Sequence, residues 1–411
     1  MHILYIHQYF ATRRGGTGTR SYEFARRWVL AGHRVTMLTS QSQLTPEDMQ
    51  GQAGRRVARF EIEGVDVVAL AVPYRQSMGT TARVWSFIRF MLASVRHTLR
   101  IRDVDVVYAT STPPTVGVPA MACRFVRHVP FVFEIRDLWP DGPIAIGALK
   151  SRVLIGLLRW FERRVYKSAS AIVCCAPGPA ERVRERSPHG QIIQVVPNCS
   201  DTSFFRPDVD GSALRNRLGW NGRFVCMHAG AKGLINRLEL VVRAARNMGD
   251  HPEVLFVLVG EGSHKTKLRE QVREHGLDNV QILDRMPKGQ IPALLRAADL
   301  CLVLVADIPI MEHNSANKFF DAISAGRAVL LNYSGWQREL LEEYRAGAGC
   351  RLGDENAFIA RIIELKSDPA RLEEMGRRAR SLAEERFDRD RLSDQVLSRL
   401  KEGALSKRRT R

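Results

Sequence analysis

The feature that most constrains this chain is a regular alternation of short apolar runs with longer amphipathic stretches, separated by glycine or polar residues. Short apolar runs are typical of buried strands, and longer amphipathic stretches are typical of helices. Their alternation predicts a parallel sheet wrapped by helices, and therefore an α/β fold. The first expected strands are residues 3–6, 34–38, 65–72, 104–108, 131–135, 171–175 and 192–196, with helices at 20–30, 84–99 and 153–166.

A turn-rich segment at residues 197–207 interrupts this rhythm, which then restarts. We therefore predict two tandem Rossmann-like domains, 1–197 and 198–388, with residues 389–411 as a C-terminal helix that packs back on the first domain and ends in a frayed basic tail. A ligand cleft is expected between the domains, because open α/β sheets bind ligands at the carboxyl ends of their strands. The expected second-half strands are residues 224–228, 254–259, 280–283, 300–305 and 328–331, with a last strong helix at 390–401.

The charge of the chain is unevenly placed. The 411 residues carry a formal net charge of +18. Residues 1–197 hold 27 basic and 14 acidic residues, a difference of +13, which leaves +5 for the rest. Such a field attracts polyanionic or diphosphate-bearing partners. No recognised nucleic-acid-binding module accompanies it, so nucleic acid is not expected as the partner.

The cysteines and the apolar runs bear on the compartment. Seven cysteines form no Cys-x-x-Cys pair, a pattern that fits reduced thiols in the cytosol. The apolar N-terminal run is short and lacks a basic leader, so it is expected to be a strand and not a signal peptide. No apolar run approaches the length of a membrane span. We expect a cytoplasmic protein and leave attachment to a membrane surface open.

Two glycine-rich turns follow expected strands. Gly15, Gly16 and Thr17 open the first helix, and the turn Gly230-Ala-Lys-Gly233 opens the first helix of the second domain. Turns of this kind can leave backbone N–H groups free to hold an anion, and Lys232 adds a positive charge. The first turn is neither a P-loop nor a dinucleotide fingerprint. A tight turn without a ligand explains each of them about equally well.

A polar loop before residue 317 runs into an expected helix. Lys318 falls in the first turn of this helix, near the positive end of its dipole, and Asp321 projects one turn later. A capped helix with surface charges explains part of this pattern, but not the acidic and amide cluster beside a lysine. The polar residues gathered here are Glu312, His313, Asn314, Asn317, Lys318 and Asp321.

The strand at residues 131–135 ends in charged residues, which is where catalytic groups concentrate in such sheets. Glu134 and Asp137 are candidates for a base or an orienting group, and Arg136 is placed to keep one of them ionised. A buried Arg–Asp pair is the alternative.

Taken in order, these motifs resemble the retaining, nucleotide-sugar-dependent glycosyltransferases of family 4, which have the GT-B fold. The resemblance spans nearly the whole chain and is strongest to enzymes that build bacterial capsule, O-antigen and exopolysaccharide units, including fucosamine-type transferases. It rests on residues 15–16, 32–35, 108–114, 136–140, 197–201, 230–233, 259–262 and 315–321, running into 325–326.

The resemblance implies roles for the matched residues. In this family the second domain binds the sugar nucleotide and the first binds the acceptor. Lys318 with the 230–233 turn is implied to neutralise the departing diphosphate, and Asp321 to contact the ribose. The family's first acid aligns with His313, so recognition of the donor sugar is assigned to Glu312 and Asn314. The donor-site residues are then Gly230, Lys232, Gly233, Arg237, His313, Asn314, Asn317 and Asp321.

Two further departures from the family concern the linker and the acceptor side. The usual Asn-Gly of the linker is Asn198-Cys199, and the family's frequent histidine beside residues 136–137 is absent. Asp137 is then expected to orient or deprotonate the acceptor hydroxyl, as a catalytic residue with Lys318 and Glu312. Gly15, Gly16, Thr17 and Arg136 are assigned to an acceptor or phosphate loop.

The family mechanism implies no cofactor. Donor and acceptor are held on one face, so that the departing phosphate accepts the proton of the acceptor, and the protein supplies position and charge. Lysines and helix N-termini are expected to replace a divalent metal. We expect metal-independent transfer from a nucleotide sugar, with a UDP-sugar favoured.

A basic amphipathic segment points to the acceptor. Residues 75–102 contain six arginines and no acid, and the expected helix 84–99 interleaves them with Trp85, Phe87 and Phe90. Such a helix suits an anionic membrane face, although a helix docked on the sheet with extended arginines fits as well. The acceptor is expected to be a saccharide, or a saccharide on a lipid diphosphate at the membrane surface. The alternatives are a GT-B epimerase of the sugar nucleotide and a non-catalytic basic protein that binds nucleic acid or anionic surfaces.

Overall fold

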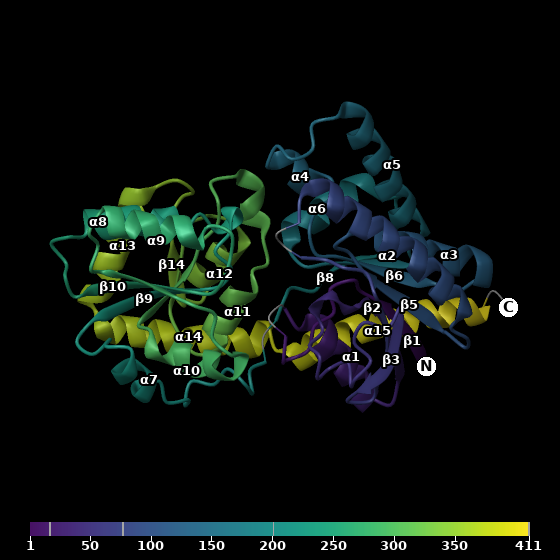
Figure 1. Cartoon of the computed structure of the whole chain (residues 1–411), viewed down its shortest axis with the longest axis horizontal. Helices are drawn as coiled ribbons and strands as arrows, with labels where there is room; N and C mark the ends of the chain where they lie inside the picture. The colour runs from purple at the N-terminus through teal and green to yellow at the C-terminus, as the bar shows by residue number, and fades with distance from the viewer. Residues whose placement is uncertain (16–17, 76–77, 200, 410–411) are drawn as a thin grey trace. The chain divides into compact units, whose positions relative to one another are not determined.

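The computed structural model describes residues 1–15, 18–75, 78–199 and 201–409. The chain divides into two compact units, which we call unit 1 (residues 1–197 with 389–411) and unit 2 (residues 198–388). Each unit is built around one sheet with helices on both faces (Figure 1). This is the α/β architecture of two Rossmann-like domains that the alternating sequence predicts.

The sheet of unit 1 has eight strands in the described residues, in the order β3-β4-β2-β1-β5-β6-β7-β8. Neighbouring strands run parallel except β3, which is antiparallel to β4 at the edge. The central strands β1, β5 and β6 are buried throughout. The bounds are β1 His2–Ile6, β2 Arg34–Ser40, β3 Val57–Ile62, β4 Val65–Leu70, β5 Val106–Thr110, β6 Phe131–Ile135, β7 Ala171–Cys174 and β8 Ile193–Val195.

Helices cover both faces of this sheet. In Figure 1, α2, α3, α5 and α6 lie on one face, and α1 and α15 on the other. Apolar side chains of α2, α3, α5 and α6 share one core cluster with the strands. The bounds are α1 Arg20–Leu30, α2 Thr80–Arg100, α3 Gly117–Arg127, α4 Asp141–Ala145, α5 Arg152–Ser168, α6 Pro177–Arg186 and α15 Arg389–Arg409, with short 3-10 turns at Gln41–Gln43 and Pro114–Val116.

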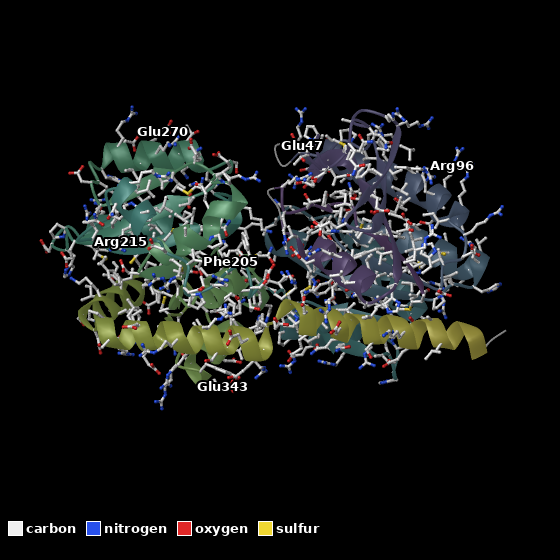
Figure 2. All side chains as sticks on the ribbon, turned by 90° about the horizontal axis from the view of Figure 1, so that it is seen from below. Glu47, Arg96, Phe205, Arg215, Glu270 and Glu343 are labelled. Atoms are coloured by element: carbon white, nitrogen blue, oxygen red, sulfur yellow. The ribbon has the colours of Figure 1, made fainter. Side chains whose placement is uncertain are left out.

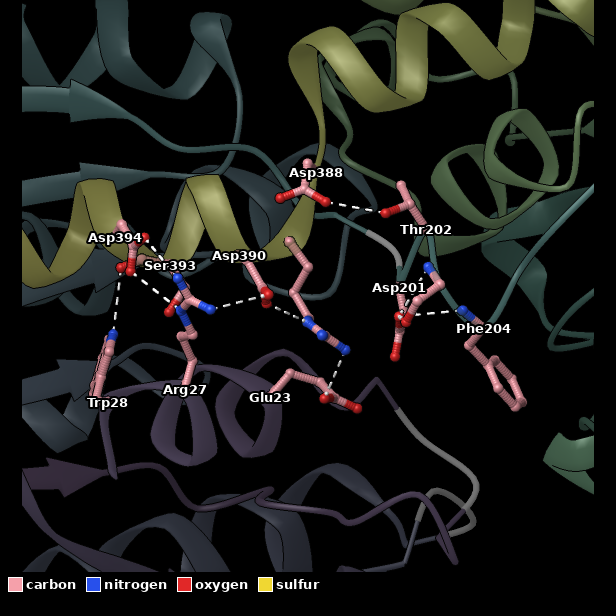
Figure 3. A network of polar contacts seen from close by, with 12 residues as sticks. Glu23, Arg27, Trp28, Asp201, Thr202, Phe204, Asp388, Asp390, Ser393 and Asp394 are labelled. Carbon is pink, nitrogen blue, oxygen red and sulfur yellow. Dashed lines mark hydrogen bonds and ion pairs between the residues drawn. The ribbon is translucent and has the colours of Figure 1, made fainter. Parts of the chain in front are cut away.

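The C-terminal helix α15 belongs to unit 1 because it packs on α1 and on the central strands β5 and β6. Trp28 of α1 donates from Nε1 to the Ser393 carbonyl at 3.3 Å. Arg27 forms ion pairs with Asp390 and Asp394, each at 3.1 Å (Figure 3). A buried aromatic residue and a charged rim therefore fix α15 on this face.

The sheet of unit 2 has six described strands, all parallel, in the order β11-β10-β9-β12-β13-β14. In Figure 1, α8, α9 and α13 lie on one face, and α10 and α14 on the other. The strand bounds are β9 Phe224–Ala229, β10 Val254–Val259, β11 Val280–Leu283, β12 Leu300–Val303, β13 Val329–Leu331 and β14 Gly347–Gly349. The helices are α7 Ser212–Arg217, α8 Glu239–Asn247, α9 Lys265–Glu274, α10 Ile291–Ala297, α11 Asn317–Ser324, α12 Trp336–Glu343, α13 Glu355–Ser367 and α14 Pro369–Arg386, with 3-10 turns at Leu234–Asn236, Lys288–Gln290 and Pro309–His313.

The chain enters unit 2 through a segment that is itself packed. Phe205, labelled in Figure 2, is buried, and Arg380 of α14 donates to its carbonyl at 2.8 Å. The same guanidinium donates to the Ser324 carbonyl at the end of α11, at 2.7 Å. Arg380 thus joins the entering segment, α11 and α14.

The structure corrects several sequence expectations. Strands β3 and β14 were not expected: β3 is an edge strand in which apolar residues alternate with charged ones, and β14 is three residues of glycine and alanine. Helix α2 begins at Thr80 instead of residue 84. Helix α15 runs to Arg409, into the segment expected to be a frayed tail, because lysine and arginine are good helix formers and no proline stops the helix.

All seven cysteines are thiols outside any disulfide, and six of them are buried. Across the described ranges, no helix combines the length and apolar character that crossing a membrane requires.

Candidate functional site

The candidate site of unit 2 lies at the carboxyl ends of β9 and β12. These strands are neighbours, and the sheet extends from them in opposite directions, to β10 on one side and to β13 on the other. Open α/β sheets bind ligands at such a switch point. Hydrogen bonds bring the end of β9, the turn at Leu234–Asn236 and the first turn of α11 together here.

A chain of hydrogen bonds holds Lys318 in this site. Its Nζ donates to Asn236 Oδ1 at 2.6 Å and to His228 Nε2 at 3.2 Å. His228 is fully buried near the end of β9, and its Nδ1 lies 3.1 Å from the Leu302 carbonyl, so the proton is assigned to Nδ1. The amide of Asn236 donates to the Ala231 carbonyl at 2.7 Å. Both acceptors of Lys318 are therefore neutral and fixed by backbone.

Burial shifts the pKa values of three side chains in this region of unit 2. Burial lowers the pKa of Lys318 to about 7. It lowers the pKa of His228 well below its ordinary value, and the neighbouring Lys318 ammonium adds to that effect. Burial also raises the pKa of Asp321, one turn along α11, to about 7, although Lys288 opposes the shift. An anion that reaches Lys318 restores its full charge, because opposite charge favours the protonated form.

The turn at residues 230–233 differs from the phosphate cradle expected from sequence. The backbone N–H groups of Gly230 and Lys232 donate to the Val259 carbonyl at 2.9 Å and to the Glu261 carbonyl at 2.7 Å, so neither is free. By contrast, a Cβ added at Gly233 would meet no neighbouring atom within 4 Å. Of the turn's two glycines, only Gly230 is closely packed.

Lys232 is a correction to the sequence prediction. Its side chain is fully buried, and Nζ donates to the carbonyls of Gly260 and, at 2.9 Å, Leu283. Burial lowers its pKa to about 8. The reason is a close approach of two loops: a Cβ on Gly260 would lie 2.1 Å from the Gly230 carbonyl oxygen, and one on Gly262 would lie 2.2 Å from that of Lys232. Lys232 thus holds the two loops together from the inside.

Gly230 faces the Lys318 network directly. A Cβ added there would lie 3.2 Å from His228 Nε2, 3.2 Å from Lys318 Cε and 3.3 Å from Lys318 Nζ. Glycine is therefore the residue that leaves room for this arrangement.

Two of the three predicted polar side chains in the loop before α11 form hydrogen bonds with nearby backbone groups. Asn314 donates from Nδ2 to the Met311 carbonyl at 2.6 Å and accepts from the Ala316 N–H at 3.0 Å. Glu312 accepts from the Ser334 N–H at 3.3 Å. His313 is half-buried at the end of the 3-10 turn and makes no hydrogen bond or ion pair within the described part of the chain. Of these three, His313 is the side chain left available.

Asn198 fixes the loop that leads into α11. Its backbone N–H donates to Ser315 Oγ at 3.1 Å, and its Nδ2 donates to the Ser315 carbonyl at 2.6 Å. Asn198 is buried, and Ser315 lies two residues before the helix. The residue treated as part of a linker therefore positions the first turn of α11.

Two further residues were predicted to bind the sugar nucleotide, Arg237 and Asn317. Arg237 follows the Leu234–Asn236 turn with a φ of 39° and forms an ion pair with Asp307 at 3.2 Å, where both side chains are exposed. Asn317 is the first residue of α11, and its half-buried side chain makes no hydrogen bond to another described residue.

In unit 1, the buried carboxylate at the end of β6 is Glu134. It accepts from Arg20 Nε at 2.9 Å, Tyr108 OH at 2.7 Å and Thr110 Oγ1 at 2.8 Å. Burial opposes its ionisation, but Arg20, Arg136 and the hydroxyl donors outweigh it and hold its pKa below the ordinary value. The carboxylate has no exposed surface, so it is a structural ion pair and not a base.

The predicted acceptor-side residues make contacts of their own within unit 1. Asp137 is exposed and accepts from Thr112 Oγ1 at 2.8 Å. The Arg136 N–H donates to Ser111 Oγ at 3.2 Å. Gly15 donates its N–H to the Thr12 carbonyl at 3.0 Å, and the other two residues of that turn, Gly16 and Thr17, lie outside the described residues. No group of three His, Cys, Asp or Glu side chains in the described ranges is placed to hold a metal ion.

Comparison with known proteins places both units. Residues 15–199 match the family model of the glycosyl transferase 4-like domain, and residues 221–382 match that of glycosyl transferases group 1. The chain belongs to the family 4 glycosyltransferases, with the GT-B fold. In this glycosyltransferase the Lys318 network lies within the group 1 region, and the Glu134 pair lies within the 4-like region.

Three of the proteins to which this glycosyltransferase is similar share low sequence identity with it. It is 27% identical over 179 residues to the putative colanic acid biosynthesis glycosyl transferase WcaI of Escherichia coli, a match that covers 42% of this chain and 44% of that protein. It is 25% identical over 391 residues to a glycogen synthase of Mycobacterium tuberculosis, covering 91% of this chain and 88% of that protein. The structure of Anabaena Alr3699/HepE in complex with UDP-glucose superposes with a TM-score of 0.72 at 18% identity, over 98% of this chain and 100% of that one.

Sequence reasoning missed two residues of the site in this glycosyltransferase. His228 is a histidine near the end of an otherwise apolar strand, two residues before Gly230, and that position was the available signal. Asn236 lies in a short 3-10 turn with no periodicity, so nothing in the sequence marks it.

Proposed function

We propose that this glycosyltransferase moves a sugar from a UDP-sugar to a saccharide acceptor, free or carried on a lipid diphosphate, in the biosynthesis of a bacterial cell-surface polysaccharide. The observation that carries the proposal is Lys318, a lysine held by two neutral acceptors at the switch point of the unit 2 sheet. The likeness to WcaI supports the pathway class, and the HepE complex with UDP-glucose supports the donor class.

Charge development on the leaving group explains the role of Lys318. When the bond between the sugar and the diphosphate breaks, negative charge grows on the diphosphate. A fixed ammonium beside the first turn of α11 stabilises that charge without reorganising. The absence of a side chain at Gly230 leaves room for Lys318 and His228 to lie against the turn. Asp321, which is free of side-chain hydrogen bonds within the described residues, is proposed to accept from the ribose hydroxyls.

We propose retention of configuration. The departing phosphate takes the proton of the acceptor hydroxyl on the face from which it leaves, and exposed Asp137 orients that hydroxyl from unit 1. Arg136 and the turn at Gly15 are proposed to hold phosphate of the acceptor. Because Lys318 and the helix dipole supply positive charge, transfer is expected to proceed without a divalent metal, and EDTA should leave the rate unchanged.

The direct test is transfer from a panel of UDP-, GDP-, dTDP- and ADP-sugars, with Lys318→Ala as the variant. The wild type should release UDP and form a product with retained anomeric configuration. Lys318→Ala should lose about 100-fold or more in kcat, since removing one charge-stabilising donor costs rates of that order. Equal turnover in the folded variant would remove Lys318 from the mechanism.

A sugar-nucleotide epimerase is the competing function, and the same assay separates it. An epimerase interconverts the sugar of the nucleotide without an acceptor, whereas a transferase consumes the sugar nucleotide in proportion to acceptor. If no nucleotide sugar is consumed or epimerised under any condition, the non-catalytic binding protein is favoured.

We also propose that unit 1 attaches to an anionic membrane surface, which would present a lipid-linked acceptor. Helix α2 packs on α3, and α3 packs on α5. The three helices carry eleven lysines and arginines and one acid, Glu162, which is buried and accepts from Tyr166 at 2.7 Å. They also expose large apolar side chains: Val84, Trp85, Leu92, Phe125, Val126, Val153, Leu154, Leu157 and Trp160.

This combination extends the predicted membrane helix to a surface of three helices. Arg96 of α2 is labelled in Figure 2. On α5 the exposed apolar residues stand among exposed basic ones, including Arg152, Arg159 and Arg163. Cationic heads bind anionic lipid while apolar side chains enter the headgroup region, which is the behaviour of interfacial helices.

Vesicle binding tests the membrane proposal. The protein should sediment with phosphatidylcholine vesicles only when they contain phosphatidylglycerol. The double variant Leu157→Glu with Trp160→Glu should weaken binding roughly tenfold or more, because two apolar side chains no longer enter the interface. Leu30→Glu is the matched control, since Leu30 is 71% exposed on α1, away from the three helices. Equal loss in both variants, or binding without anionic lipid, would contradict the proposal.

A further inference from the structure

A cavity lined by several arginines lies in unit 2 at the amino ends of the strands, at the end of the sheet opposite the Lys318 network. Its wall includes Phe224 at the start of β9, Asp299 directly before β12 and Ala328 directly before β13. The amino ends of these parallel strands point away from the carboxyl ends that hold His228 and Gly230. The cavity measures about 800 Å³. Six residues of β9 span about 20 Å, so the two regions are separate.

The cavity carries more positive charge than its acids compensate. Its basic residues are Arg223, Arg296, Arg327, Lys366, Arg377 and Arg380. The three acids that line it already have partners: Glu253 pairs with Lys366, Asp299 pairs with Arg215 at 3.0 Å, and Glu373 pairs with Arg377 at 2.9 Å.

Three arginines of this wall have no carboxylate partner among the described residues: Arg223, Arg296 and Arg327. Their guanidiniums contact carbonyls instead: Arg296 donates to Ala325 at 3.4 Å, Arg223 donates to Val254 at 3.5 Å, and Arg327 donates to the carbonyl of Arg296. The Nε atom of each of the three is buried and has no hydrogen-bond acceptor within the described ranges. Buried N–H donors without acceptors are rare in folded proteins, so the hydrogen-bonding capacity of these three guanidiniums is incompletely satisfied within the described residues.

Two of these cations, Arg296 and Arg327, lie close enough for Arg296 to act on the charge of Arg327. Burial lowers the pKa of Arg327 to about 10, and the nearby Arg296 guanidinium adds to this shift. Burial lowers the pKa of Arg296 as well, against weak attraction from Asp208. An anion between these side chains would relieve the repulsion and pair the charges.

We propose that this cavity is a second anion site of the glycosyltransferase, which binds a phosphate group carried on a small organic molecule. The guanidiniums of Arg223, Arg296 and Arg327 match phosphate oxygens, because an arginine fork donates two parallel hydrogen bonds. The organic part would lie on the apolar side of the wall, formed by Pro207, Phe224 and Leu372. The proposal is independent of the donor site, which lies at the carboxyl ends of the strands.

Calorimetric titration with inorganic pyrophosphate tests the site, because this probe carries the proposed chemistry alone. The wild type should bind pyrophosphate, and Lys318→Ala should retain binding in this cavity. Arg296→Gln and Arg223→Gln should each weaken it at least tenfold, as expected for loss of a charge-assisted hydrogen bond. Among the described residues, the hydrogen bonds of these two guanidiniums are long ones to the carbonyls of Ala325 and Val254, so their removal costs little structure.

Arg377→Gln is the matched control. It removes one positive charge from the same wall, but this arginine is 61% exposed and already paired with Glu373 and Glu374. Binding should stay within about twofold of the wild type, since exposed pairs contribute little. If Arg377→Gln weakens binding as much as Arg296→Gln, the effect is general charge attraction and the site is wrong.

Hydrogen exchange of the wild type gives a readout that does not depend on any variant. The experiment is done with saturating UDP, which occupies the donor site around Lys318. Pyrophosphate should then slow exchange at residues 222–225, 296–299 and 326–328. Protection confined to residues 228–236 and 314–321 would overturn the proposal, because the probe would then occupy the donor site alone.

Discussion

Lys318 donates from Nζ to Nε2 of His228, 3.2 Å away, and His228 is a buried imidazole whose other nitrogen is committed to the Leu302 carbonyl. The lysine is therefore held by a neutral acceptor where a carboxylate would have neutralised it. Its ammonium is positioned but not paired with a carboxylate of any described residue, which is the state a site for an anionic ligand requires.

Removal of the His228 imidazole should loosen the position of the Lys318 ammonium without removing its charge. His228→Phe keeps an aromatic ring in the core but leaves Lys318 with Asn236 as its remaining described acceptor. We expect UDP to bind about fivefold more weakly, because one orienting hydrogen bond is worth on the order of 1 kcal/mol. Calorimetric titration with UDP checks this. Circular dichroism confirms the fold, and unchanged affinity in a folded variant would show that Asn236 alone orients the lysine.

Nucleotide affinity should depend on pH through Lys318. Its pKa is about 7 without ligand, and a diphosphate beside it raises that value toward the ordinary 10.5. The complex then binds more protons than the free protein above pH 7, so affinity is highest at or below neutral pH and falls as pH rises. Titrations at pH 8.5 in two buffers of different ionisation enthalpy should reveal proton uptake. Lys318→Met should abolish it, and equal proton uptake by that variant would assign the proton to another group.

A methyl group at Gly230 should displace the lysine. Gly230→Ala places a Cβ 3.2 Å from both Lys318 Cε and His228 Nε2, tighter than ordinary contact. We expect kcat to fall about tenfold or more with little change in melting temperature, since small misplacements of catalytic groups cost rates of that order. Gly233→Ala is the matched control, because nothing lies within 4 Å of its Cβ and its φ is −121°. A comparable loss in both variants would point to loop flexibility instead.

The loop before α11 should depend on Asn198. Its Nδ2 donates to the Ser315 carbonyl at 2.6 Å, and aspartate at this position would turn an oxygen toward that carbonyl. Asn198→Asp should therefore raise KM for the donor severalfold, because the first turn of α11 shifts. Ser315→Ala removes only the hydroxyl contact and should have a smaller effect. Steady-state kinetics decides, and a larger effect of Ser315→Ala would contradict this order.

The sheets were predictable because their strands are nearly continuous apolar runs, and helix α1 was predicted with its observed bounds of Arg20–Leu30. Strand β14 was not, because three residues of glycine and alanine carry no pattern. The division into two units also has a local sequence signal. The polar, turn-rich segment after Pro197 interrupts the alternation of strands and helices.

The candidate site was predicted only in part. Lys318 and Asp321 were identifiable from their spacing at a helix start, but Lys232 was misread because a lysine beside glycines gives no sign of its burial. Its position depends on Gly260 and Gly262, about 30 residues later in the chain, and single-sequence patterns do not encode such contacts. The same reason hid the pairing of Glu134 with Arg20, which are 114 residues apart.

That pair should govern the stability of unit 1. Arg20→Met leaves Glu134 charged and fully buried, which typically costs about 3–5 kcal/mol. Glu134→Gln with Arg20→Met should recover part of this loss, because the uncompensated charge is gone. Hydrogen exchange at residues 106–110 and 131–135 reports on unit 1 alone, which a melting curve of both units does not.

The pH dependence of the same amides checks the assignment. The pKa of Glu134 is lower folded than unfolded, so the unfolded state binds more protons as pH falls. Stability from this group is present above the ordinary glutamate pKa of 4.5 and is lost as pH falls through the lower folded value. Glu134→Gln should flatten that part of the profile, and an unchanged acid dependence would mean that another carboxylate, and not Glu134, controls acid unfolding of this sheet.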